Sequence, residues 1–161
     1  MDGFGAKAYS KLGMQTDVLN ADPHRLVLIL FDGAIGAIHR AKGFLAQRLI
    51  AEKCEALLQA MRIVDAGLSA SVNSSFAPEF AGRLTALYKY VLMRLARGNS
   101  HNDLQALEEA ASVLADLRDA WVKIGPSTAI AYDGPSAHPE DRPAHGSPTQ
   151  VAAQVLRAYR V

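Results

Sequence analysis

The sequence contains one cysteine, few aromatic residues and almost no net charge. Cys54 is the single cysteine among 161 residues, so no disulfide can form within the chain, as expected of a reducing compartment. The formal net charge of +1 provides no broad basic surface for nucleic acid or an anionic membrane. No apolar run approaches the ~18 residues of a membrane-spanning helix, and the N-terminus lacks a signal-peptide pattern. These absences predict a cytoplasmic protein without membrane insertion or nucleic-acid binding.

Motifs for catalysis and for cofactor binding are also scarce. No Glu-x-x-His pair of the di-iron bundles occurs, and the five histidines do not fall at zinc-ligand spacings. The sequence has no P-loop, no nucleophile elbow and no complete Gly-x-Gly-x-x-Gly loop. We therefore predict that the chain is not an enzyme and uses no cofactor or metal.

One segment supports an alternative function. His39-Arg40-Ala41-Lys42-Gly43 resembles the His-x-x-Lys-Gly signature of histidine phosphotransfer domains, which are also four-helix bundles. In that chemistry an exposed imidazole is the nucleophile, and a lysine one turn away neutralises the phosphate. The small residues that follow the glycine in that family are replaced here by Phe44, Leu45 and Gln47.

What the sequence does contain is a high proportion of aliphatic residues in helical patterns. Hydrophobic residues make up 50% of the chain and aromatic residues 7%, a mixture that favours packed helices over a sheet. Four amphipathic stretches with short connections occupy residues 22–125. They predict an all-α protein whose domain is an antiparallel four-helix bundle.

The first predicted helix runs from about Pro23 to near Leu49. Asp22 is suited to accept from the free N–H groups of its first turn, and Pro23 fits the first helical position. Leu26 to Phe31 is an unbroken apolar run that points in every direction around a helix, so one side needs a partner beyond the bundle's own core. Glycines in this helix suggest places where another helix approaches closely; they are Gly33, Gly36 and Gly43.

The other three helices each carry a predicted core stripe. The stripes are Ile50, Cys54, Leu57, Met61, Val64, Leu68 and Val72; then Phe80, Leu84, Leu87, Val91 and Leu95; and finally Leu104, Leu107, Ala111, Leu114, Leu117, Trp121 and Ile124. Pro78 is expected to begin the third helix and Gly98 to end it just after Arg97. Asn102 or a near neighbour should cap the fourth helix, and Gly125-Pro126 should end it.

Two flanking segments differ in character from the bundle. Residues 1–21 are predicted to be a flexible N-terminal segment, which is either a frayed terminus or a cap over an apolar groove with Tyr9 as its anchor. Residues 126–161 contain five prolines and form a predicted Pro-rich linker, followed by a short amphipathic segment. Its stripe consists of Val151, Val155, Leu156 and Tyr159, and the pattern leaves open whether this segment docks as a helix or is a frayed end.

Three motifs carry a resemblance to a known family. Ala8-Tyr9, the stretch from Leu30 to Ile35 (Leu-Phe-Asp-Gly-Ala-Ile) and the stretch from Leu117 to Trp121 (Leu-Arg-Asp-Ala-Trp) occur in the order and spacing of the FliS family of bacterial flagellar export chaperones. The resemblance covers about residues 6–125. Phe31 stands where that family usually has tyrosine, which keeps the ring but removes its hydroxyl group.

The resemblance implies a function, partners and a set of site residues. It implies a cytoplasmic chaperone that binds the C-terminal segment of flagellin, prevents premature polymerisation and aids delivery to the export apparatus. The residues expected to bind flagellin or to cap the groove are Tyr9, Leu26, Leu30, Phe31 and Ile35. The expected structural polar motif consists of Asp22, Asp32, Arg118 and Trp121, with Asp32 and Arg118 as a buried or half-buried polar pair that links the first and fourth helices. The flagellar export gate, other flagellar regulators and a homodimer stay open as further partners, and Leu26, Leu30, Ile35, Leu117 and Trp121 are alternatively core residues.

Overall fold

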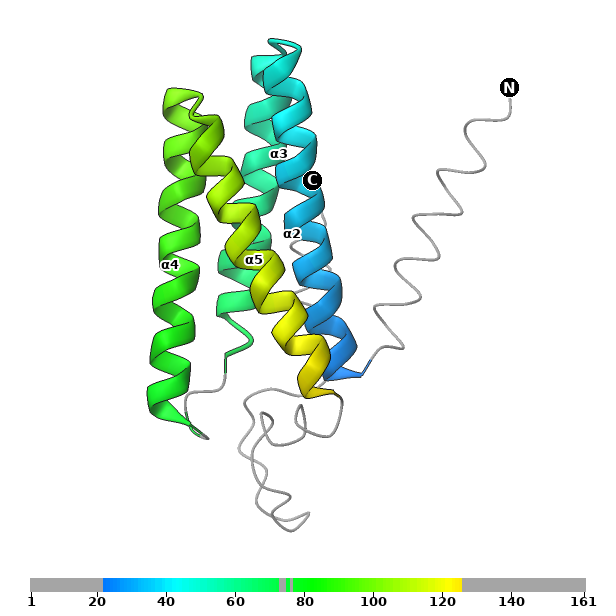
Figure 1. Cartoon of the computed structure of the whole chain (residues 1–161), viewed down its shortest axis with the longest axis vertical. Coiled ribbons are helices and arrows are strands. Elements are labelled where there is room, and N and C mark those ends of the chain that lie inside the picture. The colour runs from blue at the N-terminus through cyan, green and yellow to red at the C-terminus, as the bar shows by residue number, and fades with distance from the viewer. Residues whose placement is uncertain (1–21, 73–74, 76, 126–161) are drawn as a thin grey trace, which may run out of the picture.

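A computed structural model describes residues 22–72, 75 and 77–125 of this chain. Within them, the elements in chain order are α2 (Pro23–Ala46), α3 (Ile50–Arg62), the π-helical segment η1 (Ile63–Ser69), α4 (Pro78–His101) and α5 (Leu104–Ile124). Neighbouring helices run antiparallel, and η1 continues the rod of α3, so the described residues form the predicted all-α bundle (Figure 1). The predicted N-terminal segment and the Pro-rich tail lie outside the described residues and stay predictions.

Helix α2 begins as predicted and ends three residues early. The Arg25 N–H donates to Asp22 Oδ1 at 2.8 Å, and Pro23 is the first helical residue. At the other end, the Leu49 N–H donates to the Phe44 carbonyl and the Arg48 N–H donates to the Leu45 carbonyl. This pair of bonds is a Schellman motif, in which Arg48 adopts the left-handed conformation (φ 61°) that glycine usually supplies. Since no glycine marks this turn, the end of the helix could not be located from the sequence.

A glycine of η1 packs tightly against α2. A Cβ atom at Gly67 would lie 2.8 Å from Leu30 Cδ2, so a larger residue there would require Leu30 to move. The expectation that the glycines of α2 mark helix contacts is wrong for two of them. A Cβ at Gly36 would meet only Arg40 of its own helix, at 3.6 Å, and one at Gly43 would meet nothing within 4 Å. Both face away from the packed interior.

The connection between α4 and α5 begins later in the chain and is shorter than predicted. Helix α4 continues past Gly98 to His101, and Asn102 (φ 51°) makes the left-handed turn. Asp103 is the residue that caps α5, because its Oδ1 accepts from the Ala106 N–H at 3.1 Å. Gly98 is needed inside the helix instead, since a Cβ there would overlap Leu107 Cδ2 and lie 2.7 Å from Leu107 Cγ.

We expect Gly98→Ala to lower the free energy of unfolding by about 1–3 kcal/mol, because the added methyl group must push Leu107 out of its place. Gly82→Ala on the same helix is the matched control, since a Cβ there meets nothing within 4 Å. It should stabilise the fold by about 0.5–1 kcal/mol, as alanine does in a helix interior. Urea unfolding of both variants measures the difference. Equal stability of the two would show that the Gly98–Leu107 contact is not tight.

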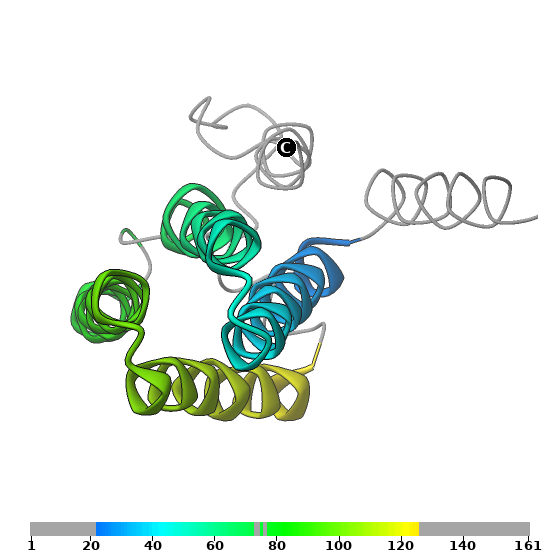
Figure 2. The same ribbon diagram turned by 90° about the horizontal axis from the view of Figure 1, so that it is seen from above.

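The core contains most members of the predicted stripes, but not all of them. The buried residues form one cluster to which all four helices and η1 contribute, and these elements surround a common interior (Figure 2). Five residues that were predicted to be in the core are instead exposed by 39–48% of their surface: Ile50, Phe80, Leu87, Leu104 and Ile124. On α4 the interior positions are taken by Ala81 and Tyr88, which lie one residue further along the chain than Phe80 and Leu87. The packed face of this helix therefore keeps part of the predicted stripe and is turned toward Ala81 and Tyr88; the retained members are Leu84, Val91 and Leu95.

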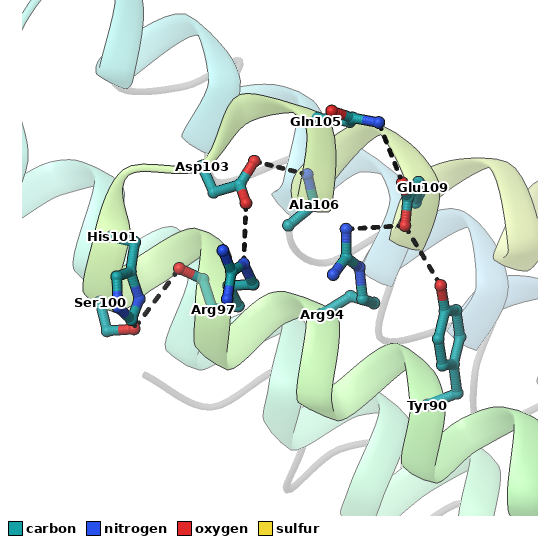
Figure 3. Close-up of polar contacts among 9 residues, drawn as sticks. All are labelled: Tyr90, Arg94, Arg97, Ser100, His101, Asp103, Gln105, Ala106 and Glu109. Atoms are coloured by element: carbon teal, nitrogen blue, oxygen red, sulfur yellow. Dashed lines mark hydrogen bonds and ion pairs between the residues drawn. The ribbon is translucent and has the colours of Figure 1, made fainter.

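Polar side chains hold α4 and α5 together near their connection (Figure 3). Glu109 accepts from Tyr90 at 3.1 Å and pairs with Arg94 at 2.8 Å, and Arg97 pairs with Asp103 at 3.0 Å. The hydrogen bond from the Ala106 N–H, followed by the one from Arg97, lowers the pKa of Asp103 below its usual value. A lowered carboxyl pKa stabilises the fold above the unfolded-state pKa, and this contribution disappears as the pH falls through the folded-state value.

Candidate partner-binding surfaces

Three of the residues expected to bind flagellin lie inside the bundle. Leu26, Leu30 and Phe31 are at most 2% exposed, and the Phe31 ring packs against that of Tyr88 with centroids 6.5 Å apart. Ile35 is half-buried on the flank of α2 and retains accessible surface. Tyr9 lies outside the described residues. The rest of the apolar run, Val27 to Ile29, is half-buried, so the bundle's own core uses one side of the run and the other side keeps accessible surface.

The predicted link between α2 and α5 is present at the surface. Arg118 donates from Nε to Asp32 Oδ1 at 2.5 Å and from Nη2 to Asp32 Oδ2 at 3.4 Å. The hydrogen bond to Asp32 raises the pKa of Arg118, so the guanidinium stays charged. The Asp32 side chain is 56% exposed and that of Arg118 is 35% exposed. A pair this accessible contributes at most about 1 kcal/mol, so its main effect is to set the register of the two helices.

Trp121 is joined to α2 by a contact that the sequence did not predict. The Trp121 indole N–H donates to the His24 carbonyl at 3.0 Å, and His24 Nε2 lies 2.8 Å from the Trp121 carbonyl oxygen. The two rings stack with centroids 5.4 Å apart and planes 12° apart. Each residue thus contacts the backbone of the other, and together they close the end of the bundle where α2 begins and α5 ends. His24 carried no sequence signal, because its partner is 97 residues away.

Lys53 is a second polar residue whose role only the tertiary structure reveals. It is 1% exposed, and its ammonium group donates to the Asn99 carbonyl at 2.8 Å and to Asn102 Oδ1 at 2.5 Å. These acceptors lie at the C-terminal end of α4, where a positive charge is favourable to the helix dipole. The lysine therefore ties α3 to the last turn of α4.

An apolar strip runs along the facing flanks of α4 and α5. The contacts of Tyr90 and Arg94 with Glu109 set these flanks opposite each other, and steps of three, four or seven residues along either helix stay on the same flank. We call this surface the α4–α5 strip; its apolar members are Phe80, Leu87, Tyr90, Val113, Leu117 and Ile124. Phe80 is 48% exposed, Leu87 40% and Ile124 39%, whereas Val113 and Leu117 are half-buried. The two helices diverge away from their connection, so the strip's α4 and α5 members are farthest apart where α4 begins and α5 ends (Figure 1).

A groove of about 410 Å³ lies between α2 and α3, on the other side of the bundle from the α4–α5 strip (Figure 2). We call it the α2–α3 groove. It combines apolar side chains with acidic and basic ones, and Arg40 spans it to donate to Gln59 Oε1 at 3.0 Å. The groove is lined by Arg40, Phe44, Glu52, Glu55, Ala56, Leu58, Gln59 and Arg62.

The residues of the phosphotransfer-like motif lie on the surface of α2. His39 is exposed, but the Lys42 ammonium group is 3.5 Å from Glu108 of α5. The lysine that would neutralise a phosphoryl group thus already has a carboxylate beside it. Among the described residues, no group of three or more histidine, cysteine or acidic residues is placed to hold a metal ion, and no helix is long and apolar enough to cross a membrane.

Comparison with known proteins supports the resemblance that the motifs indicated. The family model for the flagellar protein FliS matches residues 5–128, more than half of the chain. The chain belongs to the FliS family. Among similar FliS-family proteins is the flagellar secretion chaperone FliS of Salmonella typhimurium (strain LT2), which is 40% identical over 78% of this chain and 93% of its own length. The flagellar secretion chaperone FliS of Escherichia coli K12 is 34% identical over 73% of this chain and 86% of its own. FliSB of Pseudomonas aeruginosa is 31% identical over 71% and 90%.

Proposed function

We propose that this FliS-family chain is a cytoplasmic export chaperone for flagellin. It binds the C-terminal segment of flagellin, prevents premature polymerisation and aids delivery to the flagellar export apparatus. Membership of a family of flagellar secretion chaperones supports this role. The structural observation that carries it is the α4–α5 strip, an elongated apolar surface on the outside of a bundle whose core is already filled.

The α4–α5 strip fits an amphipathic helix better than it fits a small molecule. Its apolar side chains repeat over about three turns of each helix, as in grooves that accept a helix through anchors at i, i+3, i+4 and i+7. Exposed apolar area is favourable to cover, at roughly 25 cal/mol per Å² removed from water. Terminal segments of flagellin that are unfolded in the monomer and helical in the filament would supply such an apolar face.

The other predicted binding residues take different parts in this proposal. Leu26, Leu30 and Phe31 hold α2 in the core, as their burial supports, and they are not assigned to the contact surface. Ile35 on α2 is half-buried, and a long client that wraps around the bundle would cover its remaining accessible surface. Tyr9 is retained as a predicted anchor of the N-terminal segment.

Calorimetric titration with the flagellin C-terminal segment tests the proposal. A peptide of roughly 40 residues is long enough, at about 1.5 Å per helical residue, to wrap a bundle of this size. Binding should show a negative heat-capacity change, because apolar surface leaves water on both partners. Binding should also persist at high salt, which screens exposed charges but not apolar contacts. No detectable binding at micromolar concentrations would rule out the proposed client.

We expect Leu87→Asp to weaken binding of this peptide at least tenfold, about 1.4 kcal/mol, because it places a carboxylate in the middle of the α4–α5 strip. Ala96→Asp is the matched control on the same helix. Ala96 is exposed, and nine helical positions after Leu87 its side chain points about 180° away from the strip. Circular dichroism should show both variants to be folded. Equal weakening by the two substitutions would locate the binding site elsewhere.

A further inference from the structure

The α2–α3 groove has the size and composition of a docking site for a short amphipathic helix. Its volume of about 410 Å³ lies within the range of specific binding sites. Leu58 is 51% exposed and Phe44 is half-buried, so both still have apolar surface to cover. Glu52 and Glu55 are exposed on the α3 side and can pair with basic groups of an occupant, although Arg40 and Arg62 line the same groove.

This chain itself contains a segment with the complementary pattern. Residues 149–161 follow the family match, which ends at residue 128, and lie outside the described residues. Val151, Val155 and Tyr159 recur every four residues and would share one helical face. The charged side chains of this segment are Arg157 and Arg160, and it contains no acidic residue.

We propose that residues 149–161 dock as an amphipathic helix in the α2–α3 groove of the same chain. The stripe of Val151, Val155 and Tyr159 covers Phe44 and Leu58, and the two arginines lie toward the acidic side chains of α3. The bundle thereby gains a fifth helix that covers its second apolar surface. The proposal does not depend on the proposed function, because it concerns a contact within one chain.

The length of the connecting chain matches the distance that it must span. The contact of His24 with Trp121 places the end of α5, and so the start of the connection to the docking segment, beside the start of α2. Arg40 and Phe44 of the groove lie 17 and 21 residues along α2 from Pro23, or about 25–32 Å at 1.5 Å per residue. A flexible connection of the length of residues 126–148, about 23 residues, has a root-mean-square span of roughly 24–29 Å. A tether whose span equals the separation of its two sites gives the highest effective concentration.

Because the connecting chain tethers the segment to the bundle, the segment is docked for a large fraction of the time even if its intrinsic affinity for the groove is weak. Short flexible tethers give effective concentrations in the millimolar range. A segment whose free peptide would bind with a dissociation constant near 1 mM would then be docked about half of the time. The attraction between opposite charges raises the docked fraction at low salt, and salt screens this attraction at high concentration.

Disulfide trapping in the full-length chain tests the contact. Cys54→Ser removes the native thiol, and Leu58→Cys with Val155→Cys then places one thiol in the groove and one on the stripe. Mild oxidation should convert this pair to an intramolecular disulfide at least tenfold faster than the control pair, Leu87→Cys with Val155→Cys. Leu87 is also an exposed apolar residue, but it lies on the α4–α5 strip. A disulfide requires the two Cα atoms to come within about 7 Å, so the rate reports the docked geometry.

Each outcome of the trapping experiment decides for or against the proposal. Faster trapping at residue 58, slowed severalfold by Glu52→Lys with Glu55→Lys at low salt, supports it. Equal trapping at residues 58 and 87, or no trapping at either, contradicts it. A covalent dimer as the main product also contradicts it, because the segment would then occupy a second copy. Circular dichroism confirms that each variant is folded, and the assay contains no flagellin, so failure of the proposed function leaves its result unaffected.

Discussion

Trp121→Ala is expected to lower the free energy of unfolding by about 3–5 kcal/mol, the range for truncating a large buried aromatic residue. The substitution removes the stacking on His24 and the hydrogen bond to the His24 carbonyl, and it leaves a void where Trp121 borders Leu84 and Tyr88. Because the two ends of the domain meet at this contact, the first turn of α2 should lose its anchor. Urea unfolding followed by far-ultraviolet circular dichroism measures the loss without relying on the tryptophan signal.

Two companion variants separate the ring from its hydrogen bond. Trp121→Phe keeps an aromatic ring but lacks the N–H group, so it should be intermediate, with about 1–2 kcal/mol assigned to the unpaired carbonyl and the smaller ring. Val122→Ala is the matched control at the next position, where the side chain is 48% exposed. It should change stability by no more than about 0.5 kcal/mol. A Trp121→Ala loss as small as this would mean that the contact with His24 does not hold α5 to α2.

Lys53→Ala is expected to lower the free energy of unfolding by about 2–3 kcal/mol. It removes a buried aliphatic stem together with the donor for the Asn99 carbonyl and Asn102 Oδ1. Both acceptors belong to the turn between α4 and α5, so the loss should appear first as faster amide exchange in the last turn of α4. Thermal or urea unfolding, with hydrogen exchange at residues 97–102, measures both effects.

Lys53→Met distinguishes the ammonium group from the stem that carries it. Methionine retains most of the apolar volume but cannot donate, so a loss of about 1–2 kcal/mol would assign that amount to the two hydrogen bonds. Lys89→Ala, on the exposed side of α4, is the control for removing a lysine and should be nearly neutral. If Lys53→Met equalled or exceeded the stability of the native chain, the buried charge would be unnecessary for the fold, as is known for some buried ion pairs.

The helices themselves followed from local chemistry that is visible in the sequence. Asp22 and Pro23 begin α2 as predicted, because a capping carboxylate and a residue without an N–H group suit the first turn of any helix. Stripes such as Leu57, Val64 and Leu68 are buried because a helix with one apolar side must pack that side. The family was recognisable for a related reason, since its motifs are short and contiguous.

The binding surfaces were less predictable, because the rotation of each helix is decided by its neighbours. Leu87 and Tyr88 are adjacent and both large and apolar, yet the bundle buries Tyr88 against Phe31 and leaves Leu87 on the α4–α5 strip. The spacing of apolar residues alone does not show which of two adjacent apolar residues faces the core of the bundle.

The amino-acid sequence by itself determined the all-α class, the start of α2, the family and the pairing of Asp32 with Arg118. Only the tertiary structure decided that helices pack tightly at Gly67 and Gly98, and that Lys53 is buried. It also decided that His24 and Trp121 are hydrogen-bonded to each other. The physical reason is the separation along the chain of the residues that interact. Caps and periodicity depend on residues within about one or two turns, whereas close packing and buried hydrogen bonds join residues far apart in the chain, and only the folded bundle brings them together.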